Sequence, residues 1–468
     1  MRNWLFTSAF IILGIGGTAQ VTTRAASFLS WAPTPPMGWN SYDAYYGCVT
    51  ERQFKDEVDV LSKKLLPYGY EYAVVDYCWF NPGPKGWDPN HWVTFDVSTD
   101  SNLVVDDYGR LTPAPNRFPS GFAALAAYTH AKGMKFGIHV MRGIPRAAVW
   151  KNLPVKGTSL HAQDIASLTD TCSWNVSMYG VDATKPGAQA YYNSLLALYA
   201  SWGVDFIKVD DISAPVYHEG EIDLIRRAID GCGRKIVLSL SPGDAPLGFA
   251  QHVDNTANMY RIINDVWDRW GDMRHDFDVL NAWSSFIGGG GWPDADMLPI
   301  GKLCLTGYPE AHNNPHSGKV EHFSYLTYAE QQTMLSLWCM ARAPLMWGGS
   351  ALGSSDSTFA LLTNAEVLAI DRHSTHNHQL YLPYSRADDA DYRTWVAESP
   401  DGKTKYVALF NLRNEPADLA FKPSWEFWKG SFTATDLWTG RSVGLTNDIL
   451  KADGVPAHGV ALFKLTGQ

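Results

Sequence analysis

The segment VDFIKVDD, residues 204–211, ends a β-rich run with one lysine and two adjacent acids. Side chains on a strand alternate between its two faces, so Lys208 and Asp210 share one face while Asp211 shares the other with the apolar residues. Ligands bind at the carboxyl ends of parallel strands, where the following loops open. A structural ion pair between Lys208 and Asp210 is the competing interpretation, and these eight residues alone leave both open.

Other β-rich runs also end in charged side chains: Asp76, Arg261, Asp265, Asp294 and Asp296. Two carboxylates on different strands fit glycoside hydrolysis, with Asp210 as the nucleophile and Asp265 as the acid and then the base. We expect Lys208 to keep Asp210 ionised and an aromatic-lined pocket to keep Asp265 protonated at rest. The cysteines and histidines show no metal-ligand spacing, so no metal is predicted.

Strand-like and helix-like segments alternate over about 300 residues, which predicts a parallel sheet. About eight such units favour a (β/α)₈ TIM barrel over an open doubly wound sheet, and no G-x-G-x-x-G follows a strand, so the dinucleotide-binding fold lacks its fingerprint. The glycoside hydrolysis inferred above needs no organic cofactor. In such a barrel Asp211 should point away from the axis, toward the loop or the N-terminus of a helix. Short strands separated by turn residues after about position 376 predict an antiparallel β-sandwich. The predicted domains are therefore a catalytic barrel over 27–375 and a C-terminal sandwich over 376–468.

Composition narrows the classes of partner. The 468 residues carry a net charge of −10 and no basic run, which argues against a nucleic-acid partner. Aromatic residues make up 13% of the chain, which suits sugar rings with flat apolar faces. Residues 1–26 have the pattern of a secretory signal peptide, with cleavage after Ala19 or Ala26, so the mature protein is expected to be secreted or periplasmic. No other stretch is long and apolar enough to predict a membrane span.

Seven segments, in order, resemble the signature motifs of glycoside hydrolase family 27, the α-galactosidases or melibiases: PPMGWNSY (35–42), VDYCW (75–79), WGVDFIKVDD (202–211), YRIIND (260–265), GWPDADMLPIG (291–301), LTYAEQQTMLSLWCMARAPLMWGG (326–349) and VALFNL (407–412). The resemblance covers roughly residues 33 to 465. It implies a barrel followed by a β-sandwich, with the nucleophile at Asp210 and the acid/base at Asp265.

The resemblance also implies further roles. Residues placed at substrate-binding positions are Asp76, Lys208, Arg261, Asp296, Trp39, Tyr77, His139 and Ser241. For Trp39 a place in the core is an equally open interpretation. Cys48 and Cys78 match a disulfide pair of the family. Asp294 matches a motif position without a defined role.

Several positions depart from the family pattern and bear on which sugar is bound. Many relatives carry two adjacent acids after the second strand that grip the 4- and 6-hydroxyls of the sugar, and here the second of these positions is Tyr77. Tyr42 replaces a tryptophan and His139 replaces a tyrosine. The segment SPGD leaves Ser241 or Asp244 to serve the substituent at carbon 2.

The sequence thus predicts a retaining exo-glycosidase that removes terminal α-D-galactosyl residues from oligosaccharides or polysaccharide side chains. A β-L-arabinopyranosidase or an α-glucan-cleaving relative is the alternative among enzymes. A carbohydrate-binding protein that has lost catalysis is the alternative from another class, and the intact set of charged residues argues against it.

Overall fold

The computed structural model describes residues 27–83, 103–175, 177–306, 321–380 and 391–467. The segment predicted to be a signal peptide, residues 1–26, lies outside the described residues. Across these ranges, no helix combines the length and apolar character needed to cross a membrane.

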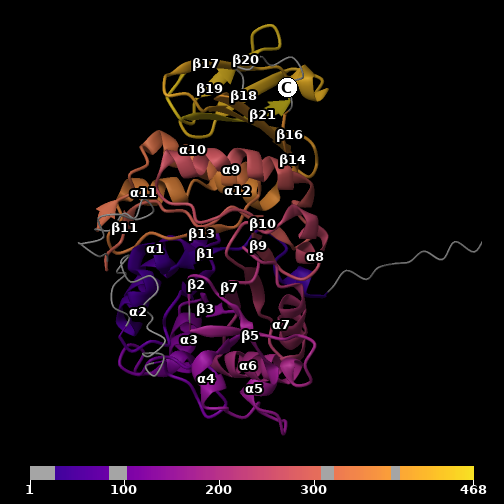
Figure 1. Cartoon of the computed structure of the whole chain (residues 1–468). Coiled ribbons are helices and arrows are strands. Elements are labelled where there is room, and N and C mark those ends of the chain that lie inside the picture. Colours follow the sequence, from indigo (N-terminus) through magenta and orange to yellow (C-terminus); the bar gives the residue numbers. More distant parts are fainter. Residues whose placement is uncertain (1–26, 84–102, 176, 307–320, 381–390, 468) are drawn as a thin grey trace, which may run out of the picture.

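The first part of the chain is the predicted (β/α)₈ barrel (Figure 1). Its sheet is wholly parallel in the order β10-β9-β8-β7-β3-β2-β1-β13. The barrel closes through Leu298, which follows β10 and bridges to Trp347 of β13. The strands are β1 (Met37–Asn40), β2 (Tyr72–Val75), β3 (Lys135–Met141), β7 (Phe206–Asp210), β8 (Val237–Leu240), β9 (Met259–Arg261), β10 (Trp292–Asp294) and β13 (Leu345–Trp347).

Helices connect the strands and cover the outside of the barrel. They are α1 (Tyr42–Tyr45), α2 (Glu51–Lys64), α3 (Gly121–Ala131), α6 (Ala188–Trp202), α7 (Glu219–Gly231), α8 (Ala250–Asp254), α9 (Trp270–Trp283), α10 (Tyr328–Met340), α11 (Asp356–Leu362) and α12 (Ala365–His373). Thr50 caps the N-terminus of α2, because its hydroxyl and the Gln53 side chain form a capping box.

The alternation of side chains along β7 is confirmed by the packing. Phe206 lies in the small apolar cluster inside the barrel together with Tyr72 and Val74 of β2. Ile207 and Val209 belong instead to the large cluster between the barrel and its helices. Lys208 and Asp210 therefore project toward the barrel axis, above the apolar plug.

A small three-stranded antiparallel sheet is inserted between β3 and α6. It pairs β6 (Met178–Val181) with β4 (Ile144–Pro145) on one side and with β5 (Ala166–Thr171) on the other. The short helices α4 (Arg146–Trp150) and α5 (Ala162–Ile165) lie between β4 and β5 in the chain. This insertion brings residue 170 next to the end of β3.

The C-terminal domain is the predicted antiparallel β-structure. A six-stranded sheet has the order β14 (Thr375–Gln379), β15 (Tyr392–Glu398), β16 (Thr404–Asn411), β21 (Val460–Gly467), β18 (Phe432–Asp436) and β19 (Ser442–Gly444). A second sheet pairs β17 (Ala417–Phe421) with β20 (Leu450–Val455). Strand β14 begins one residue before the predicted domain boundary.

The two domains share a packed interface, with α9, α10 and α12 forming a layer between the barrel and the C-terminal sheets (Figure 1). Phe277 of α9 packs edge to face on Phe410 of β16, with ring centroids 5.0 Å apart. The indole of Trp438 donates a hydrogen bond to the hydroxyl of Ser336 on α10 at 3.0 Å.

Candidate active site

Four strands deliver charged side chains to the carboxyl end of the barrel, and these side chains together are called the rim below. Asp76 follows β2, Lys208 and Asp210 end β7, Arg261 ends β9, and Asp294 ends β10. In the register of the sheet, Asp294 lies beside Arg261, and Met141 of β3 lies beside Asp210. The parallel topology therefore gathers residues that are up to about 220 positions apart in the sequence.

Asp76, which is buried, and Lys208, which is partly buried, form an ion pair, with Lys208 Nζ 3.1 Å from Asp76 Oδ2. Asn40 Nδ2 donates to the same oxygen at 2.6 Å. Burial alone would raise the pKa of Asp76, but Lys208 and the hydrogen bonds lower it to about 2. Burial likewise disfavours the ammonium, yet Asp76 and Asp210 hold the pKa of Lys208 above its ordinary value. Both side chains are therefore charged in the folded protein.

Asp210 is held on both of its carboxylate oxygens. His139 Nε2 donates to Oδ2 at 2.9 Å, and the backbone N–H of Asp211 donates to Oδ1 at 3.0 Å. Burial opposes ionisation of Asp210, but the His139 hydrogen bond and the Lys208 charge outweigh it, so the pKa of Asp210 lies below its usual value. The expectation that Lys208 helps to keep Asp210 ionised agrees with this arrangement, and His139 adds a contribution that the sequence did not indicate.

Asp211 points away from the barrel axis, as predicted, although it lies one residue past the end of β7. Its carboxylate pairs with the guanidinium of Arg142 at 2.8 Å rather than with the free amides of a loop or helix N-terminus. The predicted partner was therefore wrong, and the reason is that Arg142 follows directly on the neighbouring strand β3. Burial, which Arg142 opposes, raises the pKa of Asp211 to about 6.

Arg261 links the second predicted catalytic carboxylate to the rim. Its guanidinium contacts Asp296 Oδ1 at 2.8 Å and Asp265 Oδ1 at 3.2 Å. The side chain of Asp265 is 64% exposed, so the described residues do not form the aromatic-lined pocket expected around it. Asp265 thus lies at the open side of the site, where an incoming leaving group or water molecule has access.

Asp294 and Asp296 lie in the turn that follows the glycine-rich segment. Asp296 has a left-handed backbone with φ of 78°, and its N–H donates to Asp294 Oδ1 at 3.0 Å. Asp296 Oδ2 in turn accepts from the N–H of Val266, one residue after Asp265. Burial, opposed by Arg261, raises the pKa of Asp294 to about 7. Asp294 therefore shapes the loop that presents Asp296.

Two other predicted binding residues lie near Asp210. Tyr77 is buried with its ring edge against His139, at a centroid distance of 5.4 Å, and its hydroxyl accepts a hydrogen bond from Asn175. Ser241 is buried directly after β8, and its N–H donates to the carbonyl of Val209. Asp244, the other residue considered for the carbon 2 substituent, is exposed.

Two predictions are wrong. Trp39 is fully buried outside the barrel, where it packs on Phe54 of α2 and donates to the carbonyl of Gly349, so it cannot contact substrate. Its side chain follows the parity of β1 toward the helices. Cys48 and Cys78 are not bonded to each other, so the predicted disulfide is not formed. The pairing was implied by the family resemblance, and a motif match does not determine whether the sulfur atoms bond.

The sequence reasoning missed three polar residues of this region. Asn40 ends β1 and would have been found by asking which polar side chain ends each strand. Asp43 is buried, with a raised pKa caused first by burial and then by Asp296, and a side chain at Gly348 would collide with its Oδ2. Arg142 follows β3 and holds Asp211. Neither Asp43 nor Arg142 stands out in the sequence, because their partners are distant in the chain.

Comparisons with known proteins agree with this architecture. A family model described as alpha galactosidase A matches residues 34–185 and 176–310, and one described as the alpha galactosidase C-terminal beta sandwich domain matches residues 389–465. A solved β-L-arabinopyranosidase of family GH27 from Geobacillus stearothermophilus, in complex with arabinose, is 40% identical. It has a TM-score of 0.86, with 95% of this chain and 100% of that chain covered.

Curated relatives are more distant. Alpha-galactosidase 3 of Arabidopsis thaliana is 27% identical over 445 residues, covering 93% of this chain and 83% of the relative. Alpha-galactosidase A of Cellvibrio japonicus is 26% identical over 493 residues, covering 97% and 98%. The barrel and its carboxylate-rich rim, together with these relatives, define a glycoside hydrolase. The chain belongs to glycoside hydrolase family 27.

Proposed function

We propose that the protein is a retaining exo-glycosidase in which Asp210 is the nucleophile and Asp265 is the acid and then the base. The contacts of Asp210 with His139 and with the N–H of Asp211 support this proposal, because they leave an ionised, oriented carboxylate at the barrel axis. Asp265 sits at the exposed side of the rim, in contact with Arg261, where it reaches a leaving group entering from solvent.

The reaction proceeds in two displacements. Asp210 attacks the anomeric carbon while Asp265 gives its proton to the departing glycosidic oxygen, which forms a glycosyl ester and releases the aglycone. Asp265, now a carboxylate, takes a proton from water, and the resulting oxygen attacks the anomeric carbon and releases Asp210. The second inversion restores the original anomeric configuration.

The charged side chains of the rim can bind the hydroxyl groups of one terminal sugar ring. Asp76, Lys208, Arg261 and Asp296 are charged groups that donate or accept hydrogen bonds to ring hydroxyls, and Tyr42 lies near them with its ring centroid 6.0 Å from Lys208 Nζ. We propose that the ring has the configuration of α-D-galactopyranose at carbons 1 to 4. β-L-Arabinopyranose shares that configuration and lacks the carbon 6 arm.

Between these two rings, we propose that the β-L-arabinopyranosyl group is preferred. The buried Tyr77 stands where relatives carry the second of two acids that grip the 4- and 6-hydroxyls, so the arm of galactose loses one charged partner there. The 40% identical relative from G. stearothermophilus, which is named as a β-L-arabinopyranosidase, supports the same preference. The curated relatives named as α-galactosidases support α-D-galactosides as the second substrate class.

A panel of aryl glycosides tests the proposal. Purified protein is assayed with 4-nitrophenyl β-L-arabinopyranoside, α-D-galactopyranoside and α-D-glucopyranoside, and kcat/KM is compared. We expect the order arabinopyranoside, galactoside, glucoside, with the first two separated by about tenfold or more, since one lost contact is worth about 1–3 kcal/mol. A preference for the glucoside, or no hydrolysis of any of the three, would refute the substrate assignment.

Export and domain division stay proposals that rest on sequence patterns. We propose that residues 1–26 direct the chain to the periplasm or out of the cell, and that the enzyme acts there on oligosaccharides or polysaccharide side chains. We also propose that residues 27–375 form the catalytic domain and 376–468 the sandwich domain. Amino-terminal sequencing of exported protein tests the first point, with a new terminus expected at Gln20 or Ser27.

A further inference from the structure

Arg142 forms an unusually complete set of hydrogen bonds directly beside the proposed nucleophile. It follows β3, and its own N–H donates to the carbonyl of Asp210 at 3.0 Å. Its guanidinium is buried and uses all five of its N–H groups. Nε donates to the carbonyl of Asp211, Nη1 to Asp170 and Glu221, and Nη2 to Asp170 and the Asp211 carboxylate.

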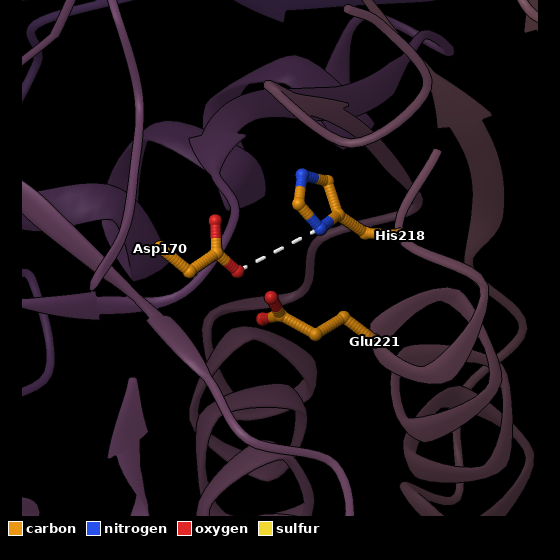
Figure 2. Close-up of side chains that lie close together, drawn as sticks. All are labelled: Asp170, His218 and Glu221. Atoms are coloured by element: carbon orange, nitrogen blue, oxygen red, sulfur yellow. Dashed lines mark ion pairs between the residues drawn. The ribbon is translucent and has the colours of Figure 1, made fainter. Parts of the chain in front are cut away.

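The far side of the guanidinium is anchored by two acids from different elements. Asp170 lies on β5 of the inserted sheet and Glu221 in the first turn of α7, and Figure 2 shows their carboxylates facing each other with His218 alongside. The bonds from Arg142 to the two acids measure 2.8 to 2.9 Å. Glu221 also accepts from the hydroxyl of Tyr192. The position of Arg142 is therefore fixed independently of Asp210 and Asp211.

The near side of the guanidinium holds the residue that orients the nucleophile. Asp211 has φ of 58°, a left-handed conformation that is uncommon for a residue with a side chain. In this conformation its N–H donates to Asp210 Oδ1 at 3.0 Å. Arg142 binds both the carbonyl of Asp211, at 2.6 Å, and its carboxylate, at 2.8 Å. The guanidinium thus binds Asp211 at two points, and these two hydrogen bonds stabilise its uncommon backbone conformation.

We propose that Arg142 is a positioning residue for the nucleophile, acting through the Asp211 backbone, an inference that rests on the proposed role of Asp210. It holds the Asp211 N–H against Asp210 Oδ1, so that Oδ2, which His139 contacts, is directed at the anomeric carbon. Asp170 and Glu221 serve as the anchors of Arg142. Because Arg142 does not itself face the sugar, its loss should lower the rate of the chemical steps more than it weakens substrate binding.

The test compares R142K with R110K in the full-length enzyme. Arg110 is the matched control, because it is also buried and pairs with a carboxylate, Asp106, and a carbonyl, Ser194, but contacts no residue of the rim. Lysine keeps the charge of Arg142 and cannot make five directed hydrogen bonds. We expect R142K to lower kcat about 30- to 100-fold with KM changed less than about threefold, and R110K to leave kcat within about threefold.

D211N separates the backbone contact from the carboxylate contact. Asparagine tolerates a left-handed backbone and keeps the carbonyl that Arg142 binds, so kcat should fall less than about tenfold in D211N. A folded R142K enzyme with kcat within about threefold of the wild type would overturn the inference. So would a loss of kcat in R142K that only matches the fall in the folded fraction measured by circular dichroism.

Two further variants allow the inference to be tested even if R142K does not fold, and separate it from the proposed role of Asp210. If R142K does not fold, D170N is used, because the Asp170 side chain is 32% exposed and its loss removes one anchor only. We expect about a fivefold or larger fall in kcat for D170N, and an unchanged kcat would overturn the inference. D210N distinguishes the two proposals. Activity in D210N would refute the role of Asp210 itself, whereas an inactive D210N beside a fully active R142K or D170N would refute only the role of Arg142.

Discussion

Replacing Asp294 by asparagine should change how the stability of the protein depends on pH. Asp294 is buried at the end of β10, and burial raises its pKa to about 7 despite the nearby Arg261. In the unfolded chain the same carboxyl has a pKa near 3.9. The folded state therefore holds this proton more tightly, and the stability that it contributes is present at low pH and lost as the pH rises through about 7.

The magnitude follows from the difference between the two pKa values. Each pKa unit is worth about 1.4 kcal/mol, so the full effect is on the order of 4 kcal/mol, of which about 2 to 3 kcal/mol falls between pH 5 and pH 7.5. Asparagine cannot ionise and still offers Oδ1 to the N–H of Asp296. D294N should therefore gain stability relative to the wild type as the pH rises.

The assay is denaturant-induced unfolding at pH 5, 6, 7 and 7.5, with D107N as a control at an exposed surface acid. We expect the difference in unfolding free energy between D294N and the wild type to grow over this range and that of D107N to stay flat. Parallel curves for D294N and the wild type would show that Asp294 ionises in the folded protein as it does in the unfolded chain, which would refute the reasoning from burial.

Three further predictions concern the rim. D265A should slow the hydrolysis of aryl glycosides with poor leaving groups about a thousandfold and that of activated ones far less, and azide should restore turnover of the activated ones. Equal losses for all leaving groups would contradict the role of Asp265 as acid/base. D210N should lose about 10⁴-fold or more in kcat while D211N stays within about tenfold, and the reverse order would show that the strand-parity reasoning is wrong. K208M should raise KM and leave Asp76 as a buried charge without its cationic partner. We therefore expect the free energy of unfolding, measured by chemical denaturation, to fall by about 3–5 kcal/mol, and an unchanged stability would contradict the ion pair.

The fold and much of the rim could be predicted from the sequence, because both depend on local sequence patterns. The alternation of side chains along β7 correctly placed Lys208 and Asp210 on the face of Phe206, opposite Ile207 and Val209. Asp211 lies one residue past the strand, with φ of 58°, and its carboxylate is held by Arg142. The start of α2 depends on residues equally close in the sequence, since Thr50 and Gln53 form its capping box. Local rules of this kind hold wherever a segment lies within a regular element.

What the sequence did not reveal depends on contacts between distant segments. Arg142 and Asp170 meet only because the inserted sheet returns to the end of β3, and no local pattern marks either residue. The exposure of Asp265 is set by the loops around it rather than by its own strand. Trp39 was assigned through a motif, although the parity of β1 directs its side chain to the outer helices. Applying strand parity to that motif would have corrected the assignment.

The measurement that tests the central claim most directly is the identification of the residue that becomes bonded to the sugar. The enzyme is incubated with an activated 2-deoxy-2,2-difluoro glycoside of the preferred sugar, which slows the second displacement, and the labelled peptide is sequenced by mass spectrometry. A glycosyl ester on Asp210, with an intact unlabelled Asp265, is the predicted result. A label on Asp211 or Asp265, or an enzyme that turns over the reagent with inversion and forms no ester, would contradict the account.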